Sequence, residues 1–226
     1  MASNPKPRVA IGGPKQGRID MANVLGAFGL KRWGTASSAP NFGFDSNPPF
    51  RIASGYGTAI YQGDLVRMNN SATGFVEQWA NGDGSTATKI LVGVFLGCRY
   101  NSLSQKKSVW NNYWPGSDAN GDVEAFVCAD PNSLWVAQAG NASAAATQTT
   151  IGQTVDVKSS PSGSTTTGIS GMLLDTANAG TSNVFPLKIV NLVTTPPGAN
   201  GTDLTTAYNY VIVAFNNQQY KALLGV

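Results

Sequence analysis

The most strand-like stretch of the chain is residues 90–100, which read ILVGVFLGCRY. Most of its positions are apolar, and valine, leucine and isoleucine are prominent among them. A near-continuous apolar run of this length is typical of a strand that is buried on both faces. We therefore expect residues 90–100 to form a central strand, around which the rest of the core is arranged.

Shorter apolar segments flank this run on both sides and are separated by turns rich in Gly, Asn, Asp and Ser. They lie at residues 58–68, 75–79, 123–127, 134–139, 150–157, 169–174, 184–193 and 208–215. Residues 62–64 (QGD) mark a turn within the first segment, where two short strands are expected to meet. About nine short strands at this spacing predict an all-β fold, a β-barrel or β-sandwich knob.

The composition favours the same fold class. Only 12% of the 226 residues are charged, which is about half the usual share. Hydrophobic residues reach 42%, enough for a sizeable core. Abundant small polar residues with few Lys and Glu favour strands and turns over a helical bundle. A chain of this length suits one large domain, or one domain with an arm.

The first 53 residues differ from the rest and are expected to form an extended basic N-terminal arm, with residues 54–226 as the body. Residues 1–51 contain seven basic and two acidic residues, a net charge of +5, whereas residues 52–226 carry a net charge of −2. Prolines and a Gly-Gly pair interrupt residues 1–18. A basic arm on a mildly acidic body indicates contact with an acidic surface, either protein or nucleic acid.

One short helix is expected within the arm, at residues 19–33. Its apolar face would consist of Met21, Val24, Leu25 and Phe28, with Lys31 and Arg32 in the last turn. Gly26 and Gly29 would make this helix marginal by itself, so it must dock on another surface.

The residues that usually carry catalysis are scarce. The chain has no histidine, which removes serine triads with a His base and His-ligated metals. Cys98 and Cys128 lie in apolar runs and are expected to be buried free thiols. Residues 118–124 alternate oxygen side chains like a calcium loop, but Val123 stands where that loop needs Gly, so a polar turn is favoured. We therefore expect that the protein is not an enzyme and that it binds no metal ion and no cofactor.

An aromatic segment, residues 109–116 (VWNNYWPG), contains Trp110, Tyr113 and Trp114. Trp and Tyr are enriched at subunit interfaces, so these rings are favoured as core or oligomer-interface anchors. The alternative is a platform on which sugar rings stack.

Four stretches resemble strands of a known group of virion proteins. They are residues 57–66 (GTAIYQGDLV), 90–100 (ILVGVFLGCRY), 187–193 (LKIVNLV) and 211–220 (VIVAFNNQQY). The group is the cement, or decoration, proteins of tailed-bacteriophage heads, notably those of short-tailed phages including cyanophages. The resemblance covers most of residues 55–221 and implies an all-β knob, often trimeric, on the outer surface of an icosahedral head.

The resemblance therefore implies a structural virion protein, made in the host cytoplasm, that cements neighbouring major-capsid subunits as a homotrimer. The arm would contribute Arg8, Lys15, Arg18, Lys31 and Arg32 for charge pairing, and Met21, Leu25 and Phe28 as its apolar face. An arm that orders only on binding can bury surface far from the knob. The alternative is a carbohydrate-binding or fibre-like adhesin module. A nucleic-acid-binding internal virion protein is less favoured because the body is acidic, and no apolar run is long enough to cross a membrane.

Overall fold

The computed structural model describes residues 22–36, 49–69, 74–86, 88–195 and 201–221. Within these residues the fold is all-β, as predicted, with helical structure limited to three short 3-10 turns. The strands are β1 (Lys31–Thr35), β2 (Phe50–Ile52), β3 (Ile60–Tyr61), β4 (Leu65–Met68), β5 (Val76–Gln78), β6 (Leu91–Asn101), β7 (Ser108–Asn111), β8 (Tyr113–Trp114), β9 (Val123–Cys128), β10 (Ser133–Gln138), β11 (Thr154–Val155), β12 (Val157–Lys158), β13 (Leu173–Leu174), β14 (Leu187–Leu192) and β15 (Tyr210–Phe215). The 3-10 turns are η1 (Asp83–Ser85), η2 (Gln148–Thr150) and η3 (Thr176–Asn178). No helix among the described residues is long and apolar enough to cross a membrane.

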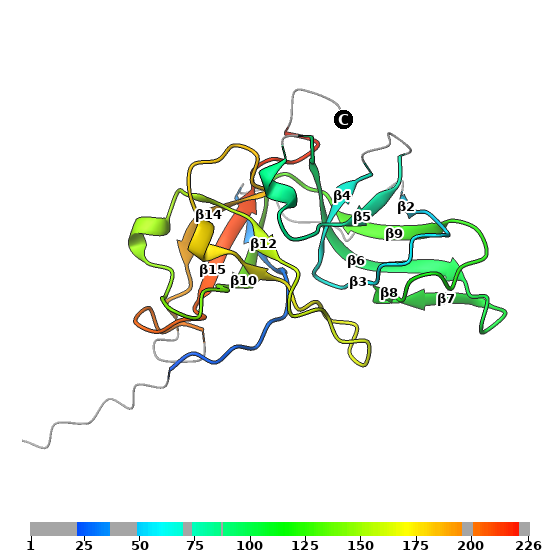
Figure 1. The fold of residues 1–226 in the computed structure, drawn as a ribbon, viewed down its shortest axis with the longest axis horizontal. Helices are drawn as coiled ribbons and strands as arrows, with labels where there is room; N and C mark the ends of the chain where they lie inside the picture. The colour runs from blue at the N-terminus through cyan, green and yellow to red at the C-terminus, as the bar shows by residue number, and fades with distance from the viewer. Residues whose placement is uncertain (1–21, 37–48, 70–73, 87, 196–200, 222–226) are drawn as a thin grey trace, which may run out of the picture.

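The strands form two lobes that lie side by side (Figure 1). The first lobe contains an antiparallel sheet in the order β1-β10-β15-β14-β11. The short pair β12 and β13 extends it, because β12 follows β11 directly and Leu174 of β13 forms a parallel bridge to Ala139 at the end of β10. Strand β1 therefore lies at one edge of the main sheet.

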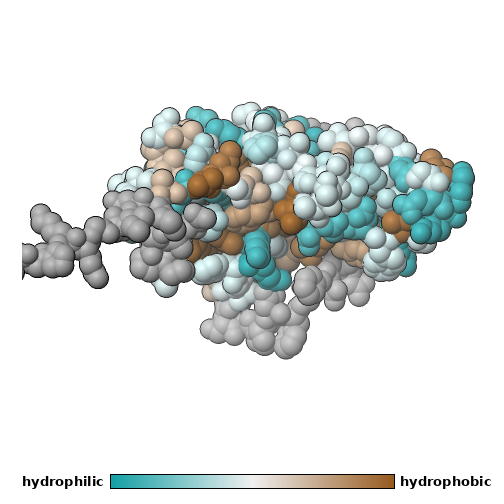
Figure 2. Space-filling model, turned by 90° about the horizontal axis from the view of Figure 1, so that it is seen from below, coloured by the Kyte–Doolittle hydropathy of each residue, from teal (hydrophilic) through white to brown (hydrophobic). Residues whose placement is uncertain are grey.

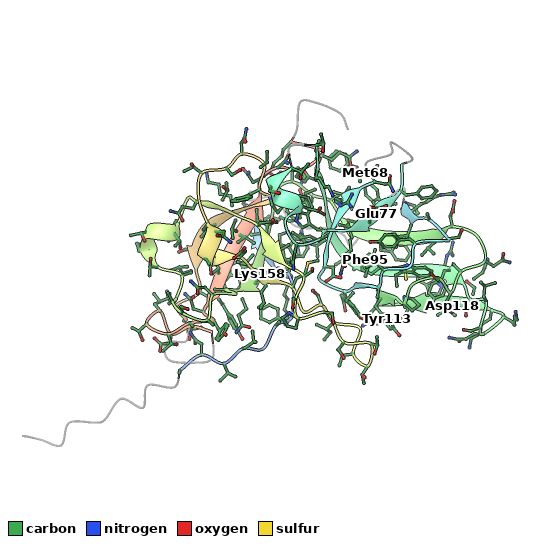
Figure 3. The ribbon with its side chains drawn as sticks, viewed as in Figure 1. Met68, Glu77, Phe95, Tyr113, Asp118 and Lys158 are labelled. Atoms are coloured by element: carbon green, nitrogen blue, oxygen red, sulfur yellow. The ribbon has the colours of Figure 1, made fainter. Side chains whose placement is uncertain are left out.

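The second lobe is a small barrel. Its sheet runs β2-β9-β6-β4-β5, and β7 pairs with the far half of β6. A parallel bridge between Arg51 and Phe75 joins the two ends of the sheet. The sheet curves around a buried cluster of inward side chains that includes Phe95 (labelled in Figure 3). The barrel form of the predicted knob is thus present in this half of the chain.

The central strand predicted at residues 90–100 is confirmed. It is β6, the longest strand of the protein, and it pairs with β4, β7 and β9. The strands predicted around it also form, although 150–157 and 169–174 contribute only the short strands β11, β12 and β13. Four strands were not predicted from the sequence: β7 and β8, which lie mostly in the aromatic segment, and β1 and β2, which lie within the predicted arm.

The helix predicted over residues 19–33 is wrong in its described part. Residues 22–30 are extended without helical structure, and residues 31–35 are β1. The backbone of this segment bonds to the body instead of to itself: Gly26 N–H donates to Gln138 at 2.9 Å. Gly29 has φ +67, a left-handed conformation that no α-helix accommodates. Contacts with distant residues thus outweigh a local apolar periodicity.

One core crosses the boundary between the lobes. Leu65 and Trp79 from the second lobe pack in the same buried cluster as Trp135 and Phe215 from the first. The chain after β15 adds a backbone link, because Gln219 N–H donates to the carbonyl of Leu91 at 2.8 Å. The lobes therefore share buried apolar surface, which is the main source of stability for such a contact.

Cys98 and Cys128 are buried and free, as predicted. They lie on the adjacent strands β6 and β9, where Cys98 pairs with Ala125 and Cys128 pairs with Val94. Burial raises the pKa of the Cys98 thiol to about 12.

Candidate docking face and aromatic row

The first described residues lie extended against the underside of the first lobe (Figure 1). We call residues 22–35 the extended segment. The side chain of Asn23 donates to the carbonyl of Asp203 at 2.8 Å and accepts from the N–H of Gly201 at 2.6 Å. Gln138 reaches the segment twice, accepting from Gly26 N–H and donating to the carbonyl of Val24 at 2.8 Å. These bonds hold residues 22–30, which have no secondary structure of their own, in place ahead of β1.

The extended segment turns apolar side chains outward. Val24 is 65% exposed, Leu25 44% and Trp33 53%. Phe28, predicted to lie on the same docked face as Leu25, instead packs edge-on against Tyr210 of the body, with ring centroids 5.4 Å apart. The exposed apolar surface is therefore made by Val24, Leu25 and Trp33, and the sequence pattern identified only the first two.

A groove of about 780 Å³ lies alongside the extended segment at the junction of the lobes. Its apolar lining includes Leu30, Trp33, Leu96, Trp135, Ile169 and Val193. Figure 2, which views the molecule from below, shows hydrophobic atoms gathered on this face over the first lobe and at the middle of the molecule. We call the extended segment and this groove the docking face. Contiguous exposed apolar surface of this kind marks interaction sites.

Two residues that line the groove each carry a buried hydrogen-bond donor. Arg32 and Trp135 are direct partners across β1 and β10. The Nε of Arg32 and the Nε1 of Trp135 are buried and have no acceptor among the described residues. A buried unpaired donor costs about 1–3 kcal/mol, and neither of these two atoms is exposed to an occupant of the groove.

The basic residues predicted for capsid contact divide into two groups. Arg8, Lys15 and Arg18 lie outside the described residues, as does Met21. Lys31 is exposed at the start of β1, but Arg32 points toward the body: its Nη2 donates to Ser133 Oγ at 3.1 Å and lies 3.8 Å from the carboxylate of Asp130. Among the described arm residues, Lys31 is thus better placed than Arg32 to meet an external charge.

The three aromatic residues of the 109–116 segment, predicted as core or oligomer-interface anchors with a sugar platform as the alternative, lie in three different environments. Trp114 is fully buried, and its indole N–H donates to the carbonyl of Tyr56 at 3.0 Å. Tyr113, at the lower side of the second lobe in Figure 3, is half-buried and stacks on Tyr61 with centroids 5.7 Å apart. Only Trp110 is exposed, at 67%. Trp114 is therefore a core anchor, as the favoured interpretation expected, and Trp110 is a surface residue.

Trp110 belongs to a row of side chains that crosses four strands on the outside of the barrel. Arg51 of β2 lies opposite Glu124 of β9, Glu124 opposite Arg99 of β6, and Arg99 opposite Trp110 of β7. Directly opposed residues share a face of the sheet. Arg99 binds Glu124 through two hydrogen bonds of 2.7 and 2.9 Å, and its guanidinium carbon lies 5.1 Å from the centroid of the Trp110 ring. We call these four residues the aromatic row.

Phe126, which lies two residues along β9 from Glu124, packs against the ring of Trp110. The two rings are parallel within 5°, with centroids 5.3 Å apart. Phe126 lies opposite Gly97 of β6, which has no side chain to separate the rings. The indole is thus held in place by an aromatic stack and a cation–π contact while much of its surface stays exposed.

Two of the carboxylates buried inside the protein are those of Asp64 and Asp156. Asp64, 1% exposed, accepts from the N–H of Tyr61 at 2.9 Å and from Gln78 at 2.7 Å. Burial raises the pKa of Asp64 although these bonds oppose the shift. Burial also raises the pKa of Asp156. Each carboxylate accepts hydrogen bonds from neighbouring residues, which is typical of a structural role.

The polar turn predicted at residues 118–124 is present. Asp118, at the far end of the second lobe in Figure 3, accepts from the hydroxyl of Ser102 at 2.7 Å and from the N–H of Ser104 at 2.9 Å. These bonds lower the pKa of Asp118. Among the described residues, no three His, Cys, Asp or Glu side chains gather in a way that would hold a metal ion.

Comparison with known proteins found no matching family model, no matching curated protein and no matching solved structure.

Proposed function

We propose that this protein is a structural virion protein that binds the outer surface of a phage capsid and cements neighbouring major-capsid subunits. The observation that carries the proposal is the extended segment, which the body holds with apolar side chains turned outward. An extended segment with exposed Val24, Leu25 and Trp33 suits adhesion to a second protein rather than internal packing. The resemblance of the strand sequences to cement proteins supplies the kind of partner.

The docking face suits a protein partner chemically. Its groove is mainly apolar, which favours association by burial of surface. Repeated binding around a symmetric shell, by a protein that is itself trimeric, would add avidity to each contact.

The proposal is tested by co-sedimentation with undecorated, expanded phage heads. The variant Leu25→Asp places a charge on the docking face, where it would be desolvated on binding. The matched control is Leu103→Asp: Leu103 is exposed to nearly the same extent, 45% against 44%. Leu103 bonds to Asp118 at the opposite end of the molecule (Figure 3).

We expect the wild type and Leu103→Asp to co-sediment with the heads to saturation, and Leu25→Asp to remain in the supernatant. Equal binding by Leu25→Asp and the wild type would contradict the assignment of the docking face. Absence of binding by the wild type would contradict the proposed function itself. Sedimentation velocity of the free protein tests the proposed trimer.

A further inference from the structure

We propose that the aromatic row is a binding site for neutral carbohydrate. The row lies on the second lobe and shares no residue with the docking face. The inference therefore stands or falls separately from the capsid proposal.

The first argument is that Trp110 offers a fixed, exposed aromatic surface. Trp110 is 67% exposed, the largest value among the large hydrophobic residues that the structure describes. Phe126 and Arg99 hold it by contacts of 5.3 and 5.1 Å to its centroid. A ligand that covers a ring already held in place loses little side-chain entropy. A surface aromatic held in this way suits the flat C–H face of a sugar ring.

The second argument comes from the polar groups beside the ring. The guanidinium of Arg99 uses two of its N–H groups for Glu124, which leaves others to donate. The carboxylate of Glu124 keeps lone pairs that can accept. Sugar hydroxyls both donate and accept, so they match this pair. The side chains of Arg99 and Glu124 are 43% and 37% exposed, within reach of a ligand from solvent.

The third argument is charge. Arg99 is paired with Glu124, and Arg51 lies 3.7 Å from the carboxylate of Asp122. Asp122 is not part of the row, but with it the two positive and two negative groups cancel, so the two ion pairs together present no net charge to attract a polyanion. A purely apolar ligand would desolvate these charges without replacing their contacts with water. A neutral ligand with hydroxyl groups can hydrogen-bond to these charged side chains, and so avoids that desolvation cost.

The experiment is isothermal titration of the full chain with three neutral oligosaccharides, namely cellohexaose, mannohexaose and chitohexaose. We expect saturable binding of at least one of them. Trp110→Ala should weaken that binding about tenfold or more, whereas Trp110→Phe should retain part of it. The matched control is Trp33→Ala, which removes another half-exposed indole, 53% exposed, from the docking face and should bind sugar like the wild type.

Three outcomes would overturn the proposal. They are no saturable binding of any of the three sugars at millimolar concentration, equal binding by Trp110→Ala and the wild type, and tighter, salt-dependent binding of the oligonucleotide dT12. The last result would assign the row to nucleic acid. Trp110→Ala should also co-sediment with phage heads like the wild type, which separates this test from that of the capsid proposal.

Discussion

The indole N–H of Trp79 donates a 2.8 Å hydrogen bond to the carboxylate of Asp156. Trp79 follows β5 in the second lobe, and Asp156 lies between β11 and β12 in the first. The same carboxylate accepts from the N–H of Gly84 at 3.1 Å. Residues 77 positions apart in sequence thereby join the two lobes through a buried polar contact.

Replacing this donor should destabilise the whole protein. In Trp79→Phe the Asp156 carboxylate loses a buried donor and the smaller ring leaves a cavity, so we expect a loss of about 2 kcal/mol or more in the free energy of unfolding. Urea denaturation measures it. Trp110→Phe is the control, because Trp110 is exposed, and it should change stability by no more than about 0.5 kcal/mol. Equal effects of the two variants would contradict the buried contact.

Stability should depend on pH through Asp64. Burial raises its folded-state pKa above the ordinary 3.8, so the folded protein binds this proton more readily than the unfolded chain. The ionised carboxylate therefore costs stability at neutral pH, and that cost is removed as the pH falls through the raised pKa toward 3.8. In Asp64→Asn the amide oxygen can still accept from Tyr61 and Gln78. We expect the wild type to gain stability relative to Asp64→Asn as the pH falls from about 7 to about 4.

Asp118 provides a control of opposite sign. Hydrogen bonds from Ser102 and Ser104 lower its pKa in the folded state. Its contribution is present above the unfolded pKa and is lost as the pH falls. The wild type should therefore lose stability relative to Asp118→Asn as the pH falls below 3.8, with little change in this difference at higher pH. Parallel pH profiles for both comparisons, measured by urea denaturation, would show that these assignments are wrong.

The conformation of the extended segment can be tested with two of its glycines, Gly26 and Gly29. Gly29 has φ +67, and a Cβ there would lie 2.6 Å from the carbonyl oxygen of Gly63. Gly29→Ala should therefore lose at least about 1 kcal/mol of stability. A Cβ at Gly26 would meet nothing within 4 Å, so Gly26→Ala should be neutral within about 0.5 kcal/mol. If the segment were helical, both substitutions would stabilise it, and thermal unfolding distinguishes the two results.

Cys98 should be unreactive in the folded protein. Its pKa of about 12 leaves almost no thiolate at pH 8, and the side chain is 1% exposed. We expect iodoacetamide to label Cys98 only after unfolding in urea, as measured by peptide mass spectrometry. Rapid labelling of the native protein would show that the strand pair β6–β9 opens readily.

The sequence alone was enough to predict the all-β class, the central strand β6 and the buried free thiols of Cys98 and Cys128. These features depend on local patterns, since a long apolar run has few alternatives to a buried strand. The turn at residues 62–64 was also predictable, because Gly63 supplies the positive φ of 96 that the turn requires.

Tertiary structure decided how residues 22–35 and the aromatic segment are used. The apolar spacing of Val24, Leu25 and Phe28 suits a helix, but the partners that keep this segment extended, such as Gln138, are more than a hundred residues away. Trp110 and Trp114 belong to different strand pairs, which expose one ring and bury the other. A sequence pattern records which side chains are apolar. Which of them face water depends on strand pairings that bring distant residues together.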